Sequence, residues 1–325
     1  MEQGGKAALG WAARDASGHL SPYSFSRRVQ RDGDVTIKVL FCGICHTDLH
    51  IIKNEHEVVG VVTDVGAGVT KFEAGDTVGV GYFVDSCRSC ESCGAGHENY
   101  CPDVVLASNG VDSDGATTQG GFSDVVVVDQ DYVVRVPRSL PLDAAAPLLC
   151  AGVTVYSPMV EYGLNAPGKR LGVVGLGGLG HMAVKFGKAF GMTVTVISSS
   201  PGKREEATER LGADEFLVSR DTEQMKAAAG TMDGIIDTVS AWHPLAALLE
   251  LLKPMGQMCP ASRWNGVGSV GDCQAMLDFA GENGITADVE VVRMDYVNTA
   301  IERLERNDVR YRFVVDVAGS LGGAA

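Results

Sequence analysis

The chain has 325 residues, a length that predicts two domains at roughly 150 residues each. Its 45% hydrophobic and 21% charged residues match folded globular proteins and exclude a disordered chain. The 27 basic and 41 acidic residues give a formal net charge of -14, which repels nucleic-acid phosphates and anionic membrane surfaces. We therefore expect neither nucleic acid nor a membrane as a partner.

The composition along the chain predicts a cytoplasmic protein. No run approaches the roughly 20 apolar residues of a membrane span, and residues 1–6 lack the basic start of a secretion signal. Four of the nine cysteines lie between Cys87 and Cys101. In a long chain without a signal peptide, this crowding favours metal thiolates over disulfides.

The first half of the chain has the texture of a β-rich domain. Short β-branched runs are separated by Gly or Asp, which predicts strands with many turns. The expected strands are 35–41, 58–65, 77–80, 124–128 and 132–136.

After Pro137, apolar runs alternate with segments of helical period. This alternation predicts a parallel, doubly wound α/β sheet. The expected strands are 171–174, 193–197, 216–218 and 234–237, the expected helices are 180–190, 203–211 and 246–252, and strands 289–292 and 312–315 fall in a mixed C-terminal segment.

A glycine-rich loop joins strand 171–174 to the following helix, and it reads Gly175-Leu176-Gly177-Gly178-Leu179-Gly180. In this context Gly175 permits the tight turn, Gly177 lets a pyrophosphate approach the backbone, and Gly180 lets the helix pack closely on the strand. The motif therefore predicts dinucleotide binding, with a ligand-free glycine corner as the alternative.

The end of the next strand favours NADP(H) over NAD(H). Ser199 stands where an acidic residue would bind the ribose 2′-hydroxyl of NAD, and no acidic residue lies nearby. Ser199, Ser200, Lys203 and Arg204 suit a 2′-phosphate instead. A helix cap by Ser200 followed by solvated basic residues remains an alternative.

Two groups of residues suggest zinc. Cys87, Cys90, Cys93 and Cys101 are spaced to hold one ion in a closed tetrahedral site, which would be structural; a metal-free redox cluster is the alternative. Segments 45–50, 56–57 and 149–154 contribute further Cys and His residues from separated positions, and two Cys with one His would make a catalytic zinc site with an open position. Cys42, Cys259 and Cys273 are expected in the core, and His19, His97, His181 and His243 at the surface or in packing roles.

Together, these segments resemble the zinc-dependent medium-chain alcohol dehydrogenases, specifically the plant cinnamyl alcohol dehydrogenase family. The resemblance covers nearly the whole chain. It rests on segments 43–48, 56–60, 87–101, 118–122, 149–154, 175–180 and 311–316.

The resemblance implies roles for individual residues. Cys45, His56 and Cys150 would bind the catalytic zinc, with Glu57 beside them as an occasional ligand. Thr47 would hydrogen-bond the substrate oxygen, and His50 would pass the proton of that oxygen to solvent. The resemblance also implies a Rossmann domain for NADP(H), residues 151–268, inserted in a β-rich GroES-like catalytic domain formed by residues 1–150 and 269–325, and a homodimer paired through sheet edges.

The chain departs from the family pattern at three places. It lacks one stretch between Glu55 and His56 and another around 257–264. Deletion of a parallel-sheet strand should be badly destabilising, because such strands are buried on both faces, so we expect flexible loops to be absent from the sequence rather than from the protein. An intact mass of 34.2 kDa would contradict this, and genuine deletions would put zinc binding by His56 in doubt. Leu106 stands where lignin-type members place a Trp in the substrate pocket, which favours a broader range of aldehydes.

The sequence thus predicts a zinc- and NADPH-dependent dehydrogenase, with two zinc ions per chain, that reduces cinnamyl-type aldehydes reversibly. One alternative is an NADPH-dependent reductase of a conjugated C=C or an iminium carbon. Another is a noncatalytic NADPH-binding protein that holds only the structural zinc.

Overall fold

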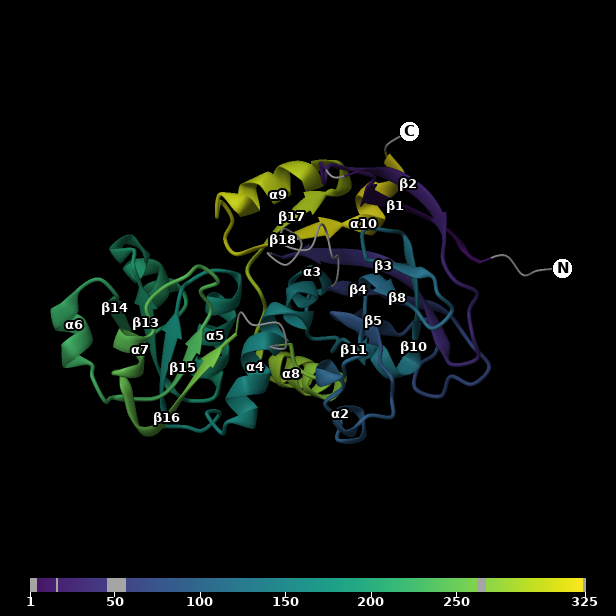
Figure 1. Ribbon diagram of the computed structural model, residues 1–325. Coiled ribbons are helices and arrows are strands. Elements are labelled where there is room, and N and C mark those ends of the chain that lie inside the picture. Colours follow the sequence, from purple (N-terminus) through teal and green to yellow (C-terminus); the bar gives the residue numbers. More distant parts are fainter. Residues whose placement is uncertain (1–4, 16, 46–56, 262–266, 324–325) are drawn as a thin grey trace. The chain divides into compact units, whose positions relative to one another are not determined.

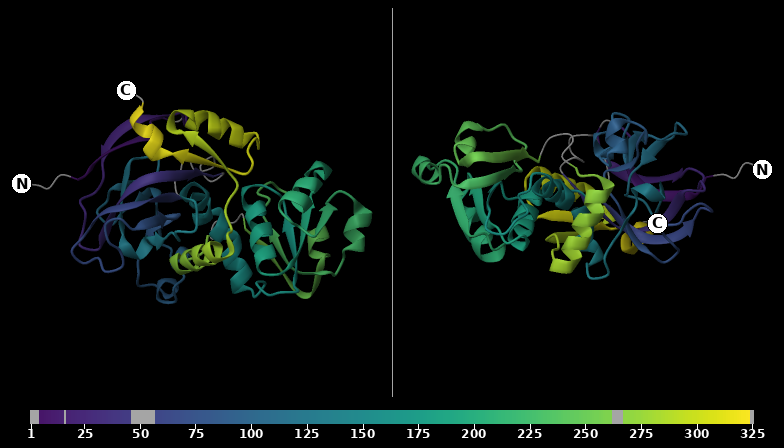
Figure 2. Two further views of the ribbon diagram at one scale, coloured as in Figure 1. Left: turned by 180° about the vertical axis from the view of Figure 1, so that it is seen from behind. Right: turned by 90° about the horizontal axis from the view of Figure 1, so that it is seen from below.

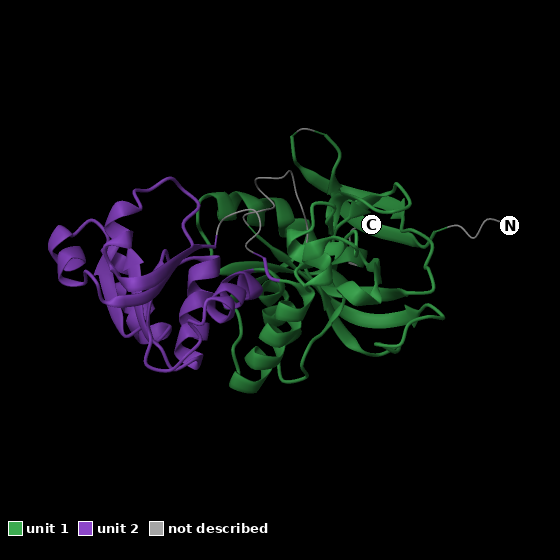
Figure 3. Cartoon of the chain, turned by 60° about the horizontal axis from the view of Figure 1, so that its bottom comes forward, with its two compact units in different colours: residues 1–150, 269–325 green, residues 151–268 purple. Residues whose placement is uncertain are grey.

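The computed structural model describes residues 5–15, 17–45, 57–261 and 267–323. Two compact units make up the chain: Met1–Cys150 with Ser269–Ala325 (unit 1), and Ala151–Gly268 (unit 2), coloured separately in Figure 3. In the part of the chain that is described, no single helix is long and apolar enough to cross a membrane, although one bent pair, Leu142–Leu149 with Ala151–Glu161, meets the same criterion of length and composition.

A seven-stranded sheet forms the centre of unit 1. Its order is β11-β5-β4-β3-β18-β17, and β10 also pairs with β3. The strands are β3 (Asp34–Ile44), β4 (Val58–Val65), β5 (Thr77–Val80), β10 (Val125–Asp129), β11 (Val134–Arg135), β17 (Val289–Arg293) and β18 (Arg312–Asp316). In Figure 1, the C-terminal β18 lies beside the N-terminal β3, and the two pair antiparallel.

Alternation of side chains explains why β3 lies in this sheet. Val35, Ile37 and Val39 are fully buried, whereas Lys38 between them is exposed. Because successive side chains of a strand point to opposite faces, this pattern puts the valines and isoleucine in the core. They pack with Phe122 and residues of β18 in one hydrophobic cluster.

Smaller elements surround this sheet. Three two-stranded ribbons are β1-β2, β6-β7 and β8-β9, and the helices carry buried stripes, as in α9, where Val297, Ala300, Ile301 and Leu304 face inward. The elements are β1 (Ala7–Ala13), β2 (Leu20–Ser26), β6 (Phe83–Asp85), β7 (Val105–Leu106), β8 (Ser108–Val111), β9 (Thr117–Gln119), α2 (Glu91–Gly94), α3 (Leu142–Ala145), α8 (Val270–Asn283), α9 (Val297–Glu305) and α10 (Val317–Ser320), with short 3-10 turns η1 (Glu98–Tyr100), η2 (Gln130–Tyr132), η3 (Ala146–Leu149), η6 (Met294–Tyr296) and η7 (Leu321–Gly323).

Unit 2 is a five-stranded parallel sheet with the order β14-β13-β12-β15-β16. This order reverses direction at β12, as in dinucleotide-binding sheets. Figures 1 and 2 show helices on both sides of the sheet, so the predicted doubly wound fold is confirmed. The elements are α4 (Ala151–Glu161), β12 (Arg170–Val174), α5 (Gly178–Ala189), β13 (Thr193–Ser198), η4 (Pro201–Lys203), η5 (Glu206–Arg210), β14 (Glu215–Val218), α6 (Thr222–Ala227), β15 (Met232–Asp237), α7 (Ala246–Leu249) and β16 (Leu252–Pro260).

Three predicted elements differ from the structure. The expected strand 132–136 shrinks to β11, because Asp129 caps a 3-10 turn over Gln130–Tyr132 by accepting from Asp131 N. The expected helix 203–211 is a 3-10 turn followed by the π-helical η5. The expected helix 246–252 ends at Leu249, and Leu252 begins β16, which pairs with β15.

Candidate functional site

Three potential metal ligands meet in unit 1: the Sγ atoms of Cys45 and Cys150 and a carboxylate oxygen of Glu57 lie within 4.8 Å of one another. Their exposed fractions are 4%, 7% and 0%. Two thiols and a carboxylate are ligands that zinc accepts, so these residues fit a zinc ion. We call them the buried cluster.

Tertiary packing assembles the buried cluster from three separate segments. Cys45 directly follows β3, and Glu57 directly precedes β4, whose first residue Val58 pairs with Cys42 of β3. Cys150 ends the buried turn η3, which packs on β3, β4, β5 and β18. The antiparallel β3–β4 pair therefore brings two of the ligands together, and η3 adds the third.

Arg312 lies beside the buried cluster and is 3% exposed. Its Nη2 donates to Glu57 Oε1, and the charges of Glu57, Cys45 and Cys150 offset the desolvation of the guanidinium and raise its pKa. Contact with Cys45, followed by burial, raises the pKa of the Cys150 thiol well above its usual value. A metal ion that binds there must displace thiol protons.

Glu57 also dictates the residue that faces it on β3. A Cβ atom at Gly43 would overlap Glu57 Oε2, and Gly43 N donates to Glu57 O at 3.2 Å. Glu57 itself has φ 78°, a left-handed conformation that non-glycine residues seldom adopt. Gly43 is therefore the residue that leaves room for the carboxylate inside the cluster.

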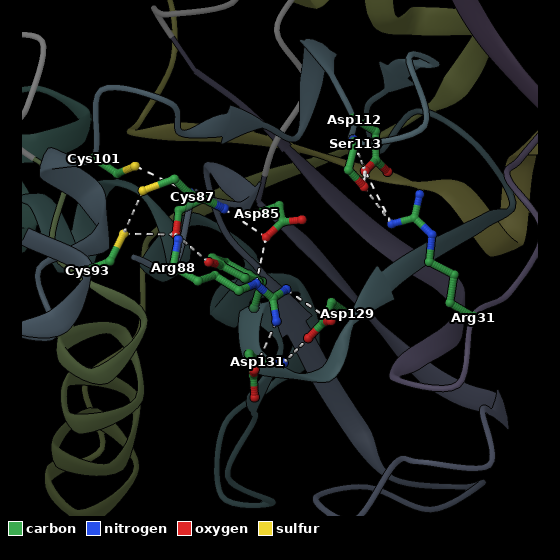
Figure 4. Close-up of polar contacts among 12 residues, drawn as sticks. Arg31, Asp85, Cys87, Arg88, Cys93, Cys101, Asp112, Ser113, Asp129 and Asp131 are labelled. Carbon is green, nitrogen blue, oxygen red and sulfur yellow. Dashed lines mark hydrogen bonds and ion pairs between the residues drawn. The ribbon is translucent and has the colours of Figure 1, made fainter. Parts of the chain in front are cut away.

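The second group of ligands, Cys87, Cys90, Cys93 and Cys101, also has its sulfur atoms within 4.8 Å of one another. Cys87 Sγ and Cys93 Sγ are 3.9 Å apart. Four sulfurs at about 2.3 Å from a tetrahedral zinc lie about 3.8 Å from each other, so these four residues fit a closed zinc site. We call residues 85–103 the cysteine lobe, part of which is drawn in Figure 4.

Backbone amides prepare the lobe sulfurs for a cation. Cys90 N donates to Cys87 Sγ at 3.3 Å, and Cys87 N and Asp103 N donate to Cys101 Sγ at 3.4 and 3.3 Å. Hydrogen bonds from the amides of Ser89 and Cys90 lower the pKa of Cys87 to about 6. Such donors stabilise the Cys87 thiolate, the form that binds zinc, whereas burial raises the pKa of Cys101 to about 12 in spite of its two amide donors.

In unit 2, the glycine loop has the geometry of a turn that leads into a helix. Gly175 has φ 88°, and a Cβ at Gly180 would collide with the carbonyl of Gly175. A Cβ at Gly177 would meet nothing within 4 Å. The fold alone thus requires Gly175 and Gly180, whereas Gly177 leaves open space at the N-terminus of α5, where free N–H groups favour an anion.

The predicted 2′-phosphate residues follow β13. Ser199 and Ser200 are exposed, and Ser200 makes no capping hydrogen bond with its side chain. Lys203 Nζ donates to Leu176 O of the glycine loop at 2.8 Å, and the Arg204 guanidinium lies 4.9 Å from the ring centre of Phe216. Lys203 is therefore attached to the loop itself.

The remaining predicted site residues are Thr47, His50, His56 and Leu106. Thr47, His50 and His56 lie outside the described residues. Leu106 of β7 is half-buried and pairs with Phe83 of β6. A cavity of about 70 Å³ in unit 1 is lined by its neighbour Ala107 rather than by Leu106.

Comparison with known proteins identifies the family. The alcohol dehydrogenase GroES-like domain matches residues 31–138, and the zinc-binding dehydrogenase family matches residues 178–266. A probable cinnamyl alcohol dehydrogenase of Oryza sativa subsp. japonica is 73% identical over 356 residues, covering 100% of this chain and 98% of the rice protein. The chain belongs to the cinnamyl alcohol dehydrogenase family. The predicted resemblance is confirmed.

Solved structures of cinnamyl alcohol dehydrogenases share this fold. The enzyme from Sorghum bicolor has a TM-score of 0.92 at 74% identity, covering 97% of this chain and 99% of that chain. The enzyme from Helicobacter pylori, complexed with NADP(H), has a TM-score of 0.88 at 31% identity, covering 97% and 99%. The predicted combination of a GroES-like domain with a Rossmann domain is confirmed for this family member.

The cinnamyl alcohol dehydrogenase of rice carries residues that this chain lacks. The alignment has 356 positions against 325 residues, a difference of 31. That difference agrees with missing internal stretches but does not locate them. The predicted position after Glu55 lies within residues 46–56, and the one around 257–264 overlaps residues 262–266; both of these ranges lie outside the described part of the chain.

Sequence reasoning missed several contacts of this family member. The sequence analysis predicted no role for Arg312. Its position as a charged residue directly before the apolar run 313–315 was the signal that could have marked it as a functional residue. His243, expected in a surface or packing role, has Nε2 3.0 Å from Asp237 Oδ2 at the end of β15. Cys42 and Cys273 are buried as predicted, but Cys259 is only half-buried because β16 lies at the sheet edge.

Proposed function

We propose that this chain is a zinc- and NADPH-dependent alcohol dehydrogenase that reversibly reduces cinnamyl-type aldehydes. The observation that carries the proposal is the buried cluster Cys45–Glu57–Cys150, found in a chain that is 73% identical to a rice protein named as a probable cinnamyl alcohol dehydrogenase. Residues 1–150 and 269–325 form the catalytic domain of the proposal, and residues 151–268 form its NADP(H) domain.

Cys45, His56 and Cys150 are the proposed ligands of the catalytic zinc, and Glu57 is an additional carboxylate beside them. When bound, zinc polarises the aldehyde carbonyl and NADPH supplies the hydride. Arg312 pairs with Glu57 and orients its carboxylate inside the cluster, since a buried carboxylate needs a partner. Burial of all the described cluster residues excludes water and strengthens their electrostatic effect.

The proton that completes the alcohol needs its own route. We assign Thr47 as the hydroxyl that contacts the substrate oxygen and His50 as the group that passes a proton between solvent and that oxygen, inward during aldehyde reduction and outward during alcohol oxidation. Imidazole suits this role because its ordinary pKa lies near neutrality.

Exposed Ser199 and Ser200, together with Lys203 and Arg204, support the choice of NADPH. A hydroxyl-rich strand end without acidic residues accommodates the 2′-phosphate, and Lys203 is already held at Leu176 O of the glycine loop. The structure of the Helicobacter pylori relative contains NADP(H). Gly177 would let the pyrophosphate approach the backbone.

Four further parts of the proposal concern the second metal, the substrate pocket, assembly and location. Cys87, Cys90, Cys93 and Cys101 would hold the structural zinc, and Leu106 in the pocket would widen the aldehyde range.

We also propose a cytoplasmic homodimer paired through the edges of the unit 2 sheets, where β16 is an edge strand. Light scattering that gives a mass of one chain, 34.2 kDa, would contradict the dimer.

The deciding experiment measures NADPH oxidation by the purified full chain with cinnamaldehyde and with coniferaldehyde. We expect turnover that falls when NADH replaces NADPH and stops after zinc chelation. Product analysis must show the alcohol. A product with a reduced C=C bond, or NADPH binding without turnover of any aldehyde, contradicts the proposal.

Cofactor choice is tested by Ser199→Asp, with Thr222→Asp, at the exposed first residue of α6 in the same unit, as the control. The new carboxylate should repel a 2′-phosphate and accept a hydrogen bond from a 2′-hydroxyl. We expect kcat/KM for NADPH to fall at least about tenfold while that for NADH rises. An unchanged preference would show that Ser199 does not face the ribose.

A further inference from the structure

Ser86 is a buried hydroxyl at the base of the cysteine lobe that the proposed function does not use. It directly follows β6 and directly precedes Cys87. Its Oγ lies 3.2 Å from Cys93 Sγ and 2.7 Å from the hydroxyl of Tyr132, and Arg88 N donates to the same Oγ at 3.3 Å. Ser86 and Tyr132 are 9% and 5% exposed.

Counting protons fixes the direction of these hydrogen bonds. A serine hydroxyl has one proton and two lone pairs. A zinc-bound Cys93 is a thiolate and can only accept, so Ser86 must donate to Cys93 Sγ. Its two lone pairs then accept from Arg88 N–H and from the Tyr132 hydroxyl, which leaves every donor and acceptor of Ser86 satisfied.

Neighbouring charges hold this chain of hydrogen bonds in place. The Arg88 guanidinium lies 5.2 Å from the ring centre of Tyr132 and pairs with Asp85, Asp129 and Asp131 at 3.0, 3.0 and 3.3 Å. Figure 4 shows Arg88 between these carboxylates, beside the sulfur atoms of Cys87 and Cys93. Burial raises the pKa of Tyr132 to about 12, so its hydroxyl keeps the proton that it donates.

Cys93 differs in this respect from two other lobe sulfurs. The sulfurs of Cys87 and Cys101 accept from backbone N–H groups, which a substitution leaves in place. Cys93 Sγ accepts a hydrogen bond from the Ser86 hydroxyl, and that hydroxyl accepts one from the hydroxyl of Tyr132. A substitution at Ser86 or Tyr132 can therefore change how strongly Cys93 binds zinc without replacing any of the four cysteines.

We propose that Ser86 and Tyr132 are positioning residues of the four-cysteine zinc site. The hydrogen-bond chain from Tyr132 through Ser86 to Cys93 Sγ neutralises part of the thiolate charge and fixes how long the lobe retains its zinc. Partners that lie behind metal ligands commonly change metal affinity by about 10- to 100-fold. The inference concerns the cysteine lobe alone and does not depend on which aldehyde the enzyme reduces.

The test compares zinc release in Ser86→Ala, Ser86→Thr and Ser89→Ala, measured on the full zinc-loaded chain with a coloured chelator in excess. Ser89 is the matched control, because it lies in the same loop but is exposed. We expect the lobe zinc of Ser86→Ala to leave about tenfold faster than in the unmodified chain. Ser86→Thr keeps a hydroxyl and should restore slow release, and Ser89→Ala should not change it.

Tyr132→Phe removes the hydroxyl that donates to Ser86 but keeps the buried ring. It therefore tests the hydrogen-bond chain even if Ser86→Ala does not fold. Loss of one hydrogen bond predicts release about threefold faster. Cadmium NMR gives a second signature, because a four-sulfur site resonates apart from a two-sulfur site. The cadmium chemical shift of the four-sulfur site should change in Ser86→Ala and Tyr132→Phe and should not change in Ser89→Ala. The chemical shift of the two-sulfur site should be the same in all three variants.

Equal release rates and an unchanged four-sulfur resonance in folded Ser86→Ala and Tyr132→Phe would overturn the proposal. So would a chain whose lobe holds no metal. If aldehyde reduction is absent but release and resonance change as expected, the function proposed above fails while this inference stands.

Discussion

The two clusters of metal ligands in unit 1 are built in opposite ways. The cysteine lobe takes all four sulfurs from one stretch of fifteen residues, Cys87 to Cys101, whose own backbone amides donate to the sulfurs of Cys87 and Cys101. The buried cluster takes Cys45, Glu57 and Cys150 from three segments, and its nearest charge, Arg312, comes from a fourth.

This difference agrees with the different roles proposed for the two sites. Four ligands on a short loop enclose an ion completely and leave no position for a substrate, which suits a structural site. Ligands on separate strands surround a shared interior, so each can be oriented by the core around it. The lobe should therefore tolerate changes elsewhere in the fold, and the buried cluster should not.

The largest expected effect comes from Cys150→Ser. The substitution removes a proposed ligand of the catalytic zinc, whose several kcal/mol of charge stabilisation correspond to at least about a thousandfold in turnover. Zinc content should fall from two ions per chain to one, measured by elemental analysis. Cys101→Ser should also lose one ion but keep turnover per folded molecule, and the same loss of turnover in both variants would erase the distinction between the clusters.

Arg312→Met should destabilise unit 1 by about 3 to 5 kcal/mol, because it leaves the buried carboxylate of Glu57 without its guanidinium. Urea unfolding measures the change. The double variant Arg312→Met with Glu57→Leu removes both charges and should recover most of that stability. If the double variant is no more stable than the single one, the ion pair does not account for the loss.

Gly43→Ala should cost about 1 to 3 kcal/mol, since the added methyl group overlaps Glu57 Oε2 and forces the carboxylate to move. Zinc binding to the buried cluster should weaken, and binding to the cysteine lobe should not. Gly94→Ala is a matched control, because a Cβ at Gly94 meets nothing within 4 Å. Equal effects of the two substitutions on thermal unfolding would contradict the close contact of Gly43 with Glu57.

The smallest effect is expected for Arg88→Ala in the cysteine lobe. The Arg88 side chain is 42% exposed, so solvent screens its three ion pairs and the expected cost is about 1 kcal/mol or less. The cost should shrink further in high salt, as measured by thermal unfolding at two salt concentrations. A cost that does not change with salt would point to the stacking of Arg88 on Tyr132 rather than to its ion pairs.

Local spacing made much of the fold and one metal site predictable. Strands 58–65 and 77–80 coincide with β4 and β5 because their alternating β-branched residues face one core. The glycine loop was recognisable because Gly175 and Gly180 meet local requirements of turn and packing. The four cysteines of the lobe were recognisable because a short loop forces neighbours in sequence to be neighbours in space.

The sequence by itself determined which stretches are β-rich and which alternate strand with helix, the glycine loop and the cysteine lobe, because each depends on residues a few positions apart. Only the tertiary structure decided that Arg312 of β18 lies against Glu57, that Gly43 must lack a side chain, and that Tyr132 reaches Cys93 through Ser86. The members of each of these contacts lie on different strands or turns, and the distance between them is set by how β3, β4, β18 and the lobe pack. No spacing along the chain encodes that packing.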